Sequence, residues 1–198
     1  MLFYPEDAPI PAELRTDLFL VRPLRASDAE LDYEAYMSSP ETIAIHSGGR
    51  WTVEGFTVAE DRRLAEQHER DHHARRNFAF IVMTPAGDKS LGCVYVLPLS
   101  PYLQRIGADE AVAVGVGAGA AMVTFWLRQG YEDTDLSRRL IEALREWFRR
   151  EWTFARIFFR ANSDEVGSLQ ALESAGLFRL YTLATDYPPH EYYLYGEA

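Results

Sequence analysis

The stretch that decides the fold is residues 120–177, which read AAMVTFWLRQGYEDTDLSRRLIEALREWFRREWTFARIFFRANSDEVGSLQALESAGL. Its first apolar run, Met122–Leu127, is rich in β-branched and aromatic side chains and predicts a buried strand. From Leu136 onward, apolar residues recur at helical spacing with arginine and glutamate between them, which predicts a long amphipathic helix. Residues 154–161 predict a second strand, and a second helix then runs as far as Gly176.

A strand, helix, strand and helix in this order imply two parallel strands joined by the first helix. Open parallel sheets bind ligands beyond the carboxyl ends of their strands, next to helix N-termini. We therefore expect the ligand site near residues 126–138. Asn162 and Glu165 match a capping box that opens the second helix.

The composition argues against several classes of partner. The 198 residues are 47% hydrophobic and 25% charged, which is typical of a globular protein long enough for one domain. The net charge of −10 disfavours nucleic acid and anionic membranes as partners. Cys93 is the only cysteine, so no internal disulfide can form, and with no apparent signal peptide we expect a cytoplasmic protein. Residues 111–127 carry no charge, but their glycine and alanine content disfavours a membrane span.

The rest of the chain predicts an α/β fold with a mixed sheet, of the α+β mixed type. Apolar runs at 78–84 and 91–97, separated by turn residues, predict an antiparallel hairpin. Ser27 and Glu30 match the S-x-x-E pattern and predict a helix start. The further expected elements are a strand at 18–24, a helix as far as about Ser38, a loop at 40–55, a helix at 56–75, an irregular connection at 99–119 and a last strand at 187–195. Together they predict one domain with a core at about 18–195, built as a central mixed sheet flanked by helices.

This order of elements, with Arg22–Ala29 (RPLRASDA) at the first strand–helix junction, resembles the GNAT superfamily of N-acetyltransferases. The chain is most similar to the branch that includes the ribosomal-protein N-terminal acetyltransferases. Further matching pieces are the 78–97 hairpin, Phe125-Trp126-Leu127, and Ser168–Leu177 (SLQALESAGL), which resembles the family segment S-x-x-x-L-E-x-x-G-F. The resemblance covers about residues 18–183 and implies a GNAT-like acyl-CoA N-acyltransferase fold.

The resemblance also implies a function. The protein would be an N-acyltransferase that passes an acetyl group from acetyl-CoA to an amine of a small molecule or peptide by direct attack, without a metal. The cosubstrate would lie where the strand ending near Leu127 splays from the strand starting near Phe154, with its pyrophosphate on the amides of the next helix N-terminus. The residues that the resemblance assigns to pantetheine are Phe125, Trp126, Leu127 and Arg128, and those assigned to the phosphates and a further contact are Asp133, Thr134, Asp135, Leu136, Ser137, Arg138 and Asn162.

The turn before the long helix departs from the family pattern Arg/Gln-x-x-Gly-x-Gly/Ala. Residues 132–137 read EDTDLS, so acidic side chains enter the turn and only Ser137 stays small. A carboxylate about 5 Å from a phosphate costs roughly 1 kcal/mol in water and about 3 kcal/mol at an effective dielectric constant of about 20. Two interpretations stay open: Asp133 and Asp135 cap the helix themselves, or their side chains turn outward and the amides still bind pyrophosphate.

Two catalytic positions of the family are also changed. Relatives often carry a glutamate base on the strand before the turn, where the nearest residue here is Met122, so the base stays unassigned. The tyrosine that protonates the thiolate in many relatives aligns with Leu172, whereas Ser168 matches the serine used in the N-terminal acetyltransferase branch. Ser168 is therefore the candidate general acid, with a small helix residue facing the sheet as the alternative role. The alternative function is a catalytically degenerate GNAT-fold binding or regulatory protein that does not use CoA.

Three further patterns are interpreted as structural. His68–His72 matches the zinc motif H-E-x-x-H, but its helix is charged nearly all round, which indicates a solvated surface. Residues 115–120 match G-x-G-x-x-A, but a strand follows instead of the helix that a dinucleotide site requires. His46, Trp51 and Tyr95 could line an acceptor pocket, and we favour a packing role for them.

The net charge gives one indication of the acceptor. An acidic protein suits a cationic amine, such as a polyamine, an aminoglycoside or a basic peptide terminus. The oligomeric state stays open, with a homodimer among the options.

Overall fold

The structure is a computed structural model that describes residues 3–131, 135–186 and 189–198. Within these residues, one eight-stranded mixed sheet runs in the order β1-β2-β3-β4-β5-β6-β8-β7. Its strands are β1 (Leu14–Arg15), β2 (Leu20–Pro23), β3 (Phe78–Met83), β4 (Ser90–Pro98), β5 (Ala121–Leu127), β6 (Ile157–Asn162), β7 (Phe178–Asp186) and β8 (Pro189–Gly196). The helices are α1 (Ala29–Met37), α2 (Pro40–Ser47), α3 (Val58–His73), α4 (Leu99–Arg105), α5 (Glu110–Val116), α6 (Asp135–Glu151) and α7 (Val166–Ser174), with a 3-10 turn at Ala26–Asp28 before α1.

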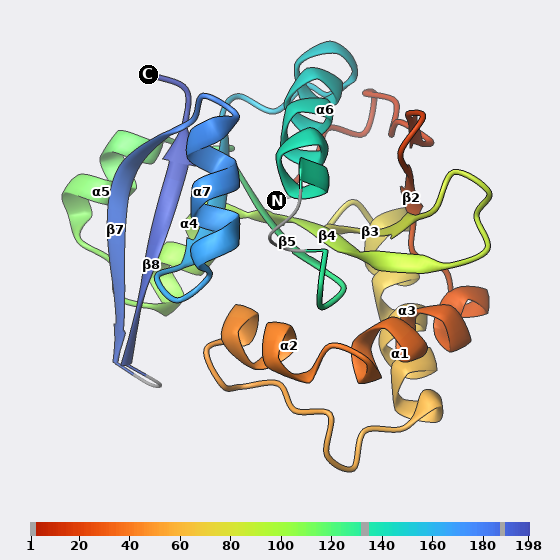
Figure 1. The fold of residues 1–198 in the computed structure, drawn as a ribbon. Helices are drawn as coiled ribbons and strands as arrows, with labels where there is room; N and C mark the ends of the chain where they lie inside the picture. The colour runs from red at the N-terminus through yellow and green to blue at the C-terminus, as the bar shows by residue number, and fades with distance from the viewer. Residues whose placement is uncertain (1–2, 132–134, 187–188) are drawn as a thin grey trace.

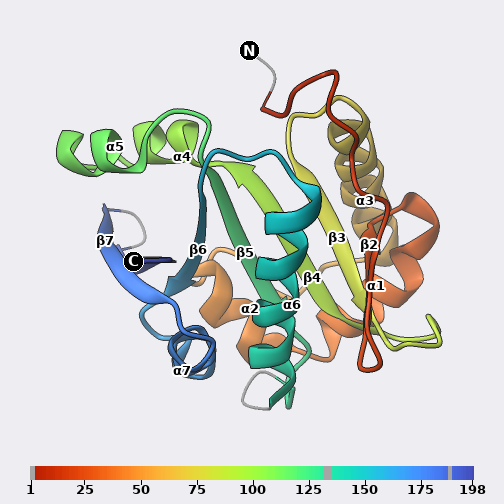
Figure 2. The same cartoon turned by 90° about the horizontal axis from the view of Figure 1, so that it is seen from above.

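Helices cover both faces of the sheet (Figure 1). α6 and α7 lie on one face, and Figure 2 shows α6 running over the central strands. The apolar stripe predicted for α6 is buried in the main core, where its members are Leu140, Ile141, Leu144, Trp147 and Phe148. α1, α2 and α3 lie on the opposite face, so the central strands are sandwiched between two helical layers (Figure 1).

The predicted parallel pair is confirmed, and it is short. β5 and β6 pair in parallel only from Ala121↔Ile157 to Val123↔Phe159. β6 begins at Ile157 rather than at Phe154 and continues along β8 as far as Asn162. β5 stays paired with β4 as far as Leu127. The two parallel strands therefore part directly after Val123, earlier than the expected point near Leu127.

Three helices lie where the sequence predicted irregular chain. α2 occupies the expected loop at 40–55, and α4 and α5 occupy the expected connection at 99–119. α2 has Pro40 in its first turn and ends before Gly48, whose φ of 63° suits a left-handed C-cap. Each of these helices spans only seven or eight residues, so no long periodic pattern marks it in the sequence.

The structure also differs from the sequence prediction in two strands and in one helix cap. β1 and β7 were not predicted, and β7 pairs with β8 as an antiparallel hairpin. The capping box expected at Ser27 is replaced by Asp28, whose carboxylate accepts the Arg25 N–H at 3.0 Å and pairs with Arg22 at 2.6 Å. The uncharged segment 111–127 divides into α5 and β5, and none of the described helices is long and apolar enough to cross a membrane.

Gly92 allows β4 to stay close to the end of β5. Its φ is 140°, and a Cβ built there would lie 2.1 Å from the carbonyl oxygen of Trp126. Any side chain at residue 92 would therefore push β4 away from the part of β5 that lies beyond the parallel pairing.

We expect Gly92→Ala to destabilise the protein by more than about 3 kcal/mol, because the unfavourable φ alone costs about 1–3 kcal/mol and the main-chain clash adds to it. Gly87→Ala is the matched control, since Gly87 also has a positive φ of 73° but no atom lies within 4 Å of its Cβ position. Denaturant unfolding measures both variants. Equal losses of unfolding free energy would show that the contact with Trp126 does not matter.

Candidate active site

The edge of β5 that faces the departing β6 carries main-chain groups of Phe125 and Leu127. Ala121 donates its N–H to the Arg156 carbonyl, just before β6, at 2.8 Å, and Arg128 donates to the Leu91 carbonyl, on the β4 side, at 2.7 Å. Because main-chain direction alternates along a strand, the N–H and C=O groups of Phe125 and Leu127 point toward β6. Over the described residues the parallel ladder ends at Val123, so β6 supplies them with no partner.

A cavity of about 580 Å³ lies on the face of the sheet that α6 does not cover, next to the point where β5 and β6 part. Its floor includes Met122, Thr124 and Trp126, which strand alternation turns away from α6. Its walls come from α1, α2, α3, α4, β4 and β6 and from the segments next to them, and they combine aromatic rings with charged groups. The other lining residues are Leu24, Asp32, Tyr36, His46, Ser47, Arg50, Trp51, Thr52, Phe56, Asp61, Leu64, Ala65, His68, Tyr95, Leu97, Tyr102, Arg105 and Arg160.

His46, in the last turn of α2, connects α7 to the cavity floor. Its side chain is 2% exposed, with Nδ1 2.7 Å from Oε1 of Glu165 and Nε2 3.3 Å from Oγ1 of Thr124. A carboxylate only accepts hydrogen bonds, so Nδ1 of the neutral ring carries the proton. Nε2 then keeps its lone pair beside Thr124. Glu165 and His46 thus have the arrangement of a base that a carboxylate orients.

Arg160, on β6, brings positive charge to the same point. Its side chain is 7% exposed and donates to Oγ1 of Thr124 at 3.4 Å and to the Tyr102 hydroxyl at 3.3 Å. Its guanidinium lies 4.5 Å from the centroid of the Tyr192 ring. No carboxylate of the described chain pairs with Arg160. A buried cation in this position stabilises negative charge nearby and disfavours a second cation.

Asp32 of α1 and Asp61 of α3 supply the negative charge of the cavity, on its β4 side. The two residues are 7% and 4% exposed. Oδ1 of Asp32 accepts the Cys93 thiol at 3.1 Å, whereas Oδ2 of Asp61 has no hydrogen-bond partner among the described residues. Burial raises the pKa of Asp32 to about 6, and burial together with the Asp32 charge raises the pKa of Asp61 to about 7. One cavity therefore holds an oriented imidazole, a buried cation and two buried carboxyl groups.

Comparison with family models identifies the fold and its chemistry. The model described as the acetyltransferase (GNAT) domain matches residues 19–177. The chain belongs to the GNAT acetyltransferase family. Acetyl transfer is the activity that this family carries. A comparison with curated proteins finds no match.

Solved GNAT structures have the same fold at low sequence identity. The ribosomal-protein-S5-alanine acetyltransferase of Vibrio fischeri is 16% identical with a TM-score of 0.71, over 94% of this chain and 96% of that one. RimL, a ribosomal L7/L12 α-N-protein acetyltransferase in complex with coenzyme A, is 11% identical with a TM-score of 0.68, over 91% and 93%. The microcin C7 self-immunity acetyltransferase MccE, in complex with acetyl-CoA and AMP, is 13% identical with a TM-score of 0.65, over 92% and 93%. The resemblance to the GNAT superfamily is confirmed, and ribosomal-protein acetyltransferases are among the structural neighbours.

The GNAT pantetheine residues predicted on β5 lie at the parting point. The side chains of Phe125 and Leu127 are buried in the core with α6, and Trp126 forms part of the cavity floor. The side chains of Phe125 and Leu127 are committed to packing, so these two residues can offer a ligand only main-chain groups. Arg128 follows, and its guanidinium forms a two-pronged ion pair with Glu34 of α1.

The predicted phosphate residues fall at and before the start of α6. Asp133 and Thr134 lie outside the described residues. Asp135 opens α6, and its carboxylate pairs with Arg138 at 2.6 Å. Arg138 also pairs with Glu142 at 2.5 Å, so its charge is already engaged on the helix surface. The negative charge of Asp135 is therefore partly balanced within α6.

Leu136 and Ser137 complete the first turn of α6, where Leu136 is half-buried and Ser137 is 1% exposed. Asn162 is fully buried, and its Nδ2 donates to the Ile45 carbonyl at 2.9 Å. Half of the predicted capping box is present, because the Glu165 carboxylate accepts the Asn162 N–H at 2.6 Å. The amide of Asn162 thus ties α2 to β6, and its contact with a cosubstrate stays a prediction.

The predicted acid, Ser168, lies half-buried in the first turn of α7, three residues after Glu165. It is not among the described residues that line the cavity. Leu172, at the position of the family tyrosine, is fully buried in the core. The acid role of Ser168 stays a prediction.

The histidines of the H-E-x-x-H pattern lie on the inner side of α3, not on the solvated surface that we expected. The His68 ring lies 5.5 Å from the Tyr95 ring in the cavity wall, and the His72 ring lies 5.0 Å from the Phe78 ring. Burial lowers the pKa of both, that of His72 to about 4. The described residues contain no group of three or more side chains that could hold a metal ion. The motif is part of the packing and of the cavity wall.

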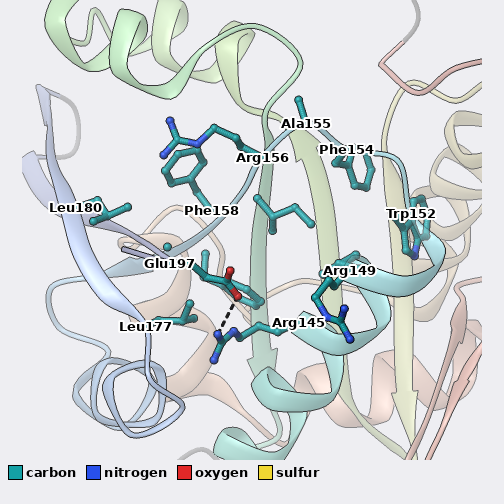
Figure 3. A pocket seen from close by; sticks show the side chains of 14 residues that line it. Arg145, Arg149, Trp152, Phe154, Ala155, Arg156, Phe158, Leu177, Leu180 and Glu197 are labelled. Carbon is teal, nitrogen blue, oxygen red and sulfur yellow. Dashed lines mark hydrogen bonds and ion pairs between the residues drawn. The ribbon is translucent and has the colours of Figure 1, made fainter.

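A second cavity, of about 370 Å³, lies beside the C-terminal end of α6 (Figure 3). Arg145 and Glu197 face one another across it and form an ion pair at 2.8 Å (Figure 3). Arg156 donates to the Gly115 carbonyl at 2.5 Å and covers the Phe158 ring. This cavity borders residues 157–159, where β5 and β6 are still paired, so it meets no parted strand edge. We do not assign the acetyl-transfer site to it.

Sequence reasoning missed the oriented imidazole. His46 and Glu165 lie 119 positions apart, so no local motif joins them. We favoured packing for His46, Trp51 and Tyr95, and the structure places all three on the cavity wall. The usable signal was the Pro40 and Gly48 pair that bounds α2, because it places His46 in a last helical turn.

The raised pKa of Asp61 predicts a pH-dependent stability. Between about pH 4, the value for an unfolded aspartate, and pH 7, the folded protein keeps a proton that the unfolded chain has lost, so its stability falls as pH rises through this window. The negative charges of Asp32 and Glu30 raise the pKa of Asp61 further, and the positive charge of Arg62 lowers it. We expect Asp61→Asn to have a higher Tm than the parent protein at pH 8, with the difference shrinking as the pH falls to about 4.

Thermal unfolding between pH 4 and pH 8 measures the effect. Glu66→Gln, at an exposed position of the same helix, is the control and should keep the parental profile. A lower Tm of Asp61→Asn at pH 8 would contradict the argument.

Proposed function

We propose that this GNAT protein transfers the acetyl group of acetyl-CoA to an amine that enters through the 580 Å³ cavity, with His46 as general base. The observation that carries the proposal is the Glu165–His46 pair, whose Nε2 lies at Thr124, where the strands part. A positioned base at this point meets the need of the reaction, because an amine must lose a proton as it becomes an amide.

The described residues fit the cosubstrate. Phe125 and Leu127 offer main-chain groups toward the gap, in the manner of a strand edge that a ligand extends. α6 begins at Asp135, and the positive end of its helix dipole would favour a pyrophosphate there. Acetyl-CoA would supply an electrophilic thioester carbonyl and a thiolate leaving group. The pairing of Asp135 with Arg138 supports the view that an acidic turn tolerates the phosphates.

Residues in and beside the cavity would have separate roles in the transfer. As the amine nitrogen forms its bond to the acetyl carbon and the carbon–sulfur bond breaks, Nε2 of His46 takes the amine proton, and Glu165 stabilises the resulting imidazolium. Arg160 favours the neutral, nucleophilic form of the entering amine and stabilises negative charge that develops on the carbonyl oxygen. Ser168 is the residue proposed to protonate the leaving thiolate.

Binding of the cosubstrate can be measured by thermal unfolding. We expect millimolar CoA to raise Tm, because a ligand at about 1,000 times its Kd stabilises the folded state by about 4 kcal/mol. ADP, which lacks the pantetheine arm, is the control and should raise Tm less. No rise in Tm with millimolar CoA would favour the alternative, a GNAT-fold binding protein that does not use CoA.

The role of His46 as general base can be tested by substitution. We expect His46→Gln to lower kcat/KM for acetyl transfer by about 10²–10⁴-fold, and Glu165→Gln to lower it by a smaller factor, because the imidazole remains but is no longer oriented by a charge. Release of the CoA thiol, measured with a panel of amines, reports the rate. His73→Gln, at an exposed histidine of α3, is the matched control. Parental kcat/KM in His46→Gln would remove His46 from the mechanism.

A further inference from the structure

We propose that the 580 Å³ cavity selects an acceptor with a second ammonium group, held by Asp32 and Asp61, so that the substrate class is a short aliphatic diamine. This inference deepens the proposed function. It depends on that function only for the acetylation of the amine that lies at His46. It is carried by three features of the cavity wall: an unsatisfied buried carboxylate, a set of aromatic rings and a separation of charge.

Asp61 is the residue that points to a ligand. Its side chain lines the cavity and is 4% exposed, yet Oδ2 has no hydrogen-bond partner among the described residues. A buried polar atom without a partner costs free energy, and an ammonium N–H in the cavity would satisfy it. Asp32, on the neighbouring helix α1, lines the same wall and is held by the Cys93 thiol at 3.1 Å. The two carboxyl groups therefore provide an anionic subsite for one cation.

Aromatic rings surround the route to this subsite. Tyr36, Phe56, Tyr95 and Trp126 line the cavity, and Trp51, which is 40% exposed, lies where an acceptor would enter. Ring faces attract ammonium groups by the cation–π effect and bury a methylene chain by the hydrophobic effect. A hydrated, hydroxyl-rich amine would gain less from these walls than a slender hydrocarbon chain with charged ends.

The opposite side of the cavity carries the opposite charge. Arg160 lies beside Thr124 there, and Arg50 and Arg105 lie on the exposed rim. Near these cations an amine is favoured in its neutral form, whereas an ammonium is favoured at the carboxyl groups. The field across the cavity thus orients a diamine with one charged end at Asp61 and one neutral end at His46.

The register of the sheet places the carboxyl groups and the imidazole over different positions of the cavity floor. Asp32 is bonded to Cys93 of β4, and His46 contacts Thr124 of β5. Cys93 is paired with Trp126, two residues from Thr124, so the two positions are diagonal neighbours about 7–8 Å apart. An acceptor held at both subsites therefore needs two separate ends, and a flexible aliphatic chain can join them.

Calorimetric titration of the full chain with hexane-1,6-diamine, without CoA, tests the subsite itself. We expect Asp61→Asn to weaken diamine binding at least about 30-fold, because one partner of a buried charge pair is lost. Asp32→Asn is the second variant and should weaken it as well, while Glu66→Gln should bind like the parent protein. Equal affinity of the parent and Asp61→Asn, or equally tight binding of hexan-1-ol, would overturn the proposal.

Acetyl transfer tests the orientation and separates the two proposals. With acetyl-CoA present, kcat/KM for hexane-1,6-diamine should exceed that for hexylamine at least about 10-fold, since hexylamine places its single nitrogen at Asp61 and inhibits instead. Equal kcat/KM for the two amines would overturn the diamine assignment. A tripeptide Ser-Lys-Ala with a higher kcat/KM than the diamine would also overturn it, in favour of a peptide source of two cations. Tight, Asp61-dependent binding of the diamine without any transfer would support the subsite and count against the proposed function alone.

Discussion

The short parallel pairing of β5 and β6 is the constraint on which the rest of the site depends. β6 leaves β5 after Phe159, while its other edge stays paired with β8 as far as Asn162. That divergence leaves main-chain groups of Phe125 and Leu127 facing a gap, while Arg160, directly after the last parallel pair, stays within reach of Thr124. It also places the end of α2 against the parted strands. A pair that continued to Leu127 would satisfy these main-chain groups internally and leave no place for a cosubstrate.

Charge is distributed on both faces of this gap in a way that suits the family's chemistry. Asp135, the first residue of α6, is paired with Arg138 and Arg139 of the same helix, so its charge is partly balanced there. On the other face, Arg160 and the Asp32–Asp61 pair lie at different places along one cavity. The net charge of −10 is therefore a poor guide to the site, because burial, pairing and position decide what each charge does.

Local signals made most of the architecture predictable from the sequence. The β5–α6–β6–α7 run and the β3–β4 hairpin were predictable because apolar periodicity and turn residues are local properties. The short helices α2, α4 and α5 depend on tertiary packing, and they were missed. The site was harder to predict than the fold, because His46 and Glu165 are 119 positions apart in the sequence. Asp32 and Asp61 belong to polar helices, and only the fold shows that they are buried.

The C-terminal end of α2, which carries His46, is anchored by groups of β6, β8 and α7, whereas Ile43 of the same helix packs on Ala35 of α1. Asn162 bonds the Ile45 carbonyl, Glu165 bonds His46, and Gly48 lies so close to β8 that a Cβ would come 2.6 Å from the Tyr192 hydroxyl. α1 and α3 take no part in these contacts. Residues that face the cavity from α1 and α3 can therefore change during evolution without moving the imidazole. The architecture allows relatives to diverge in the amine that they accept while one reaction chemistry is inherited unchanged.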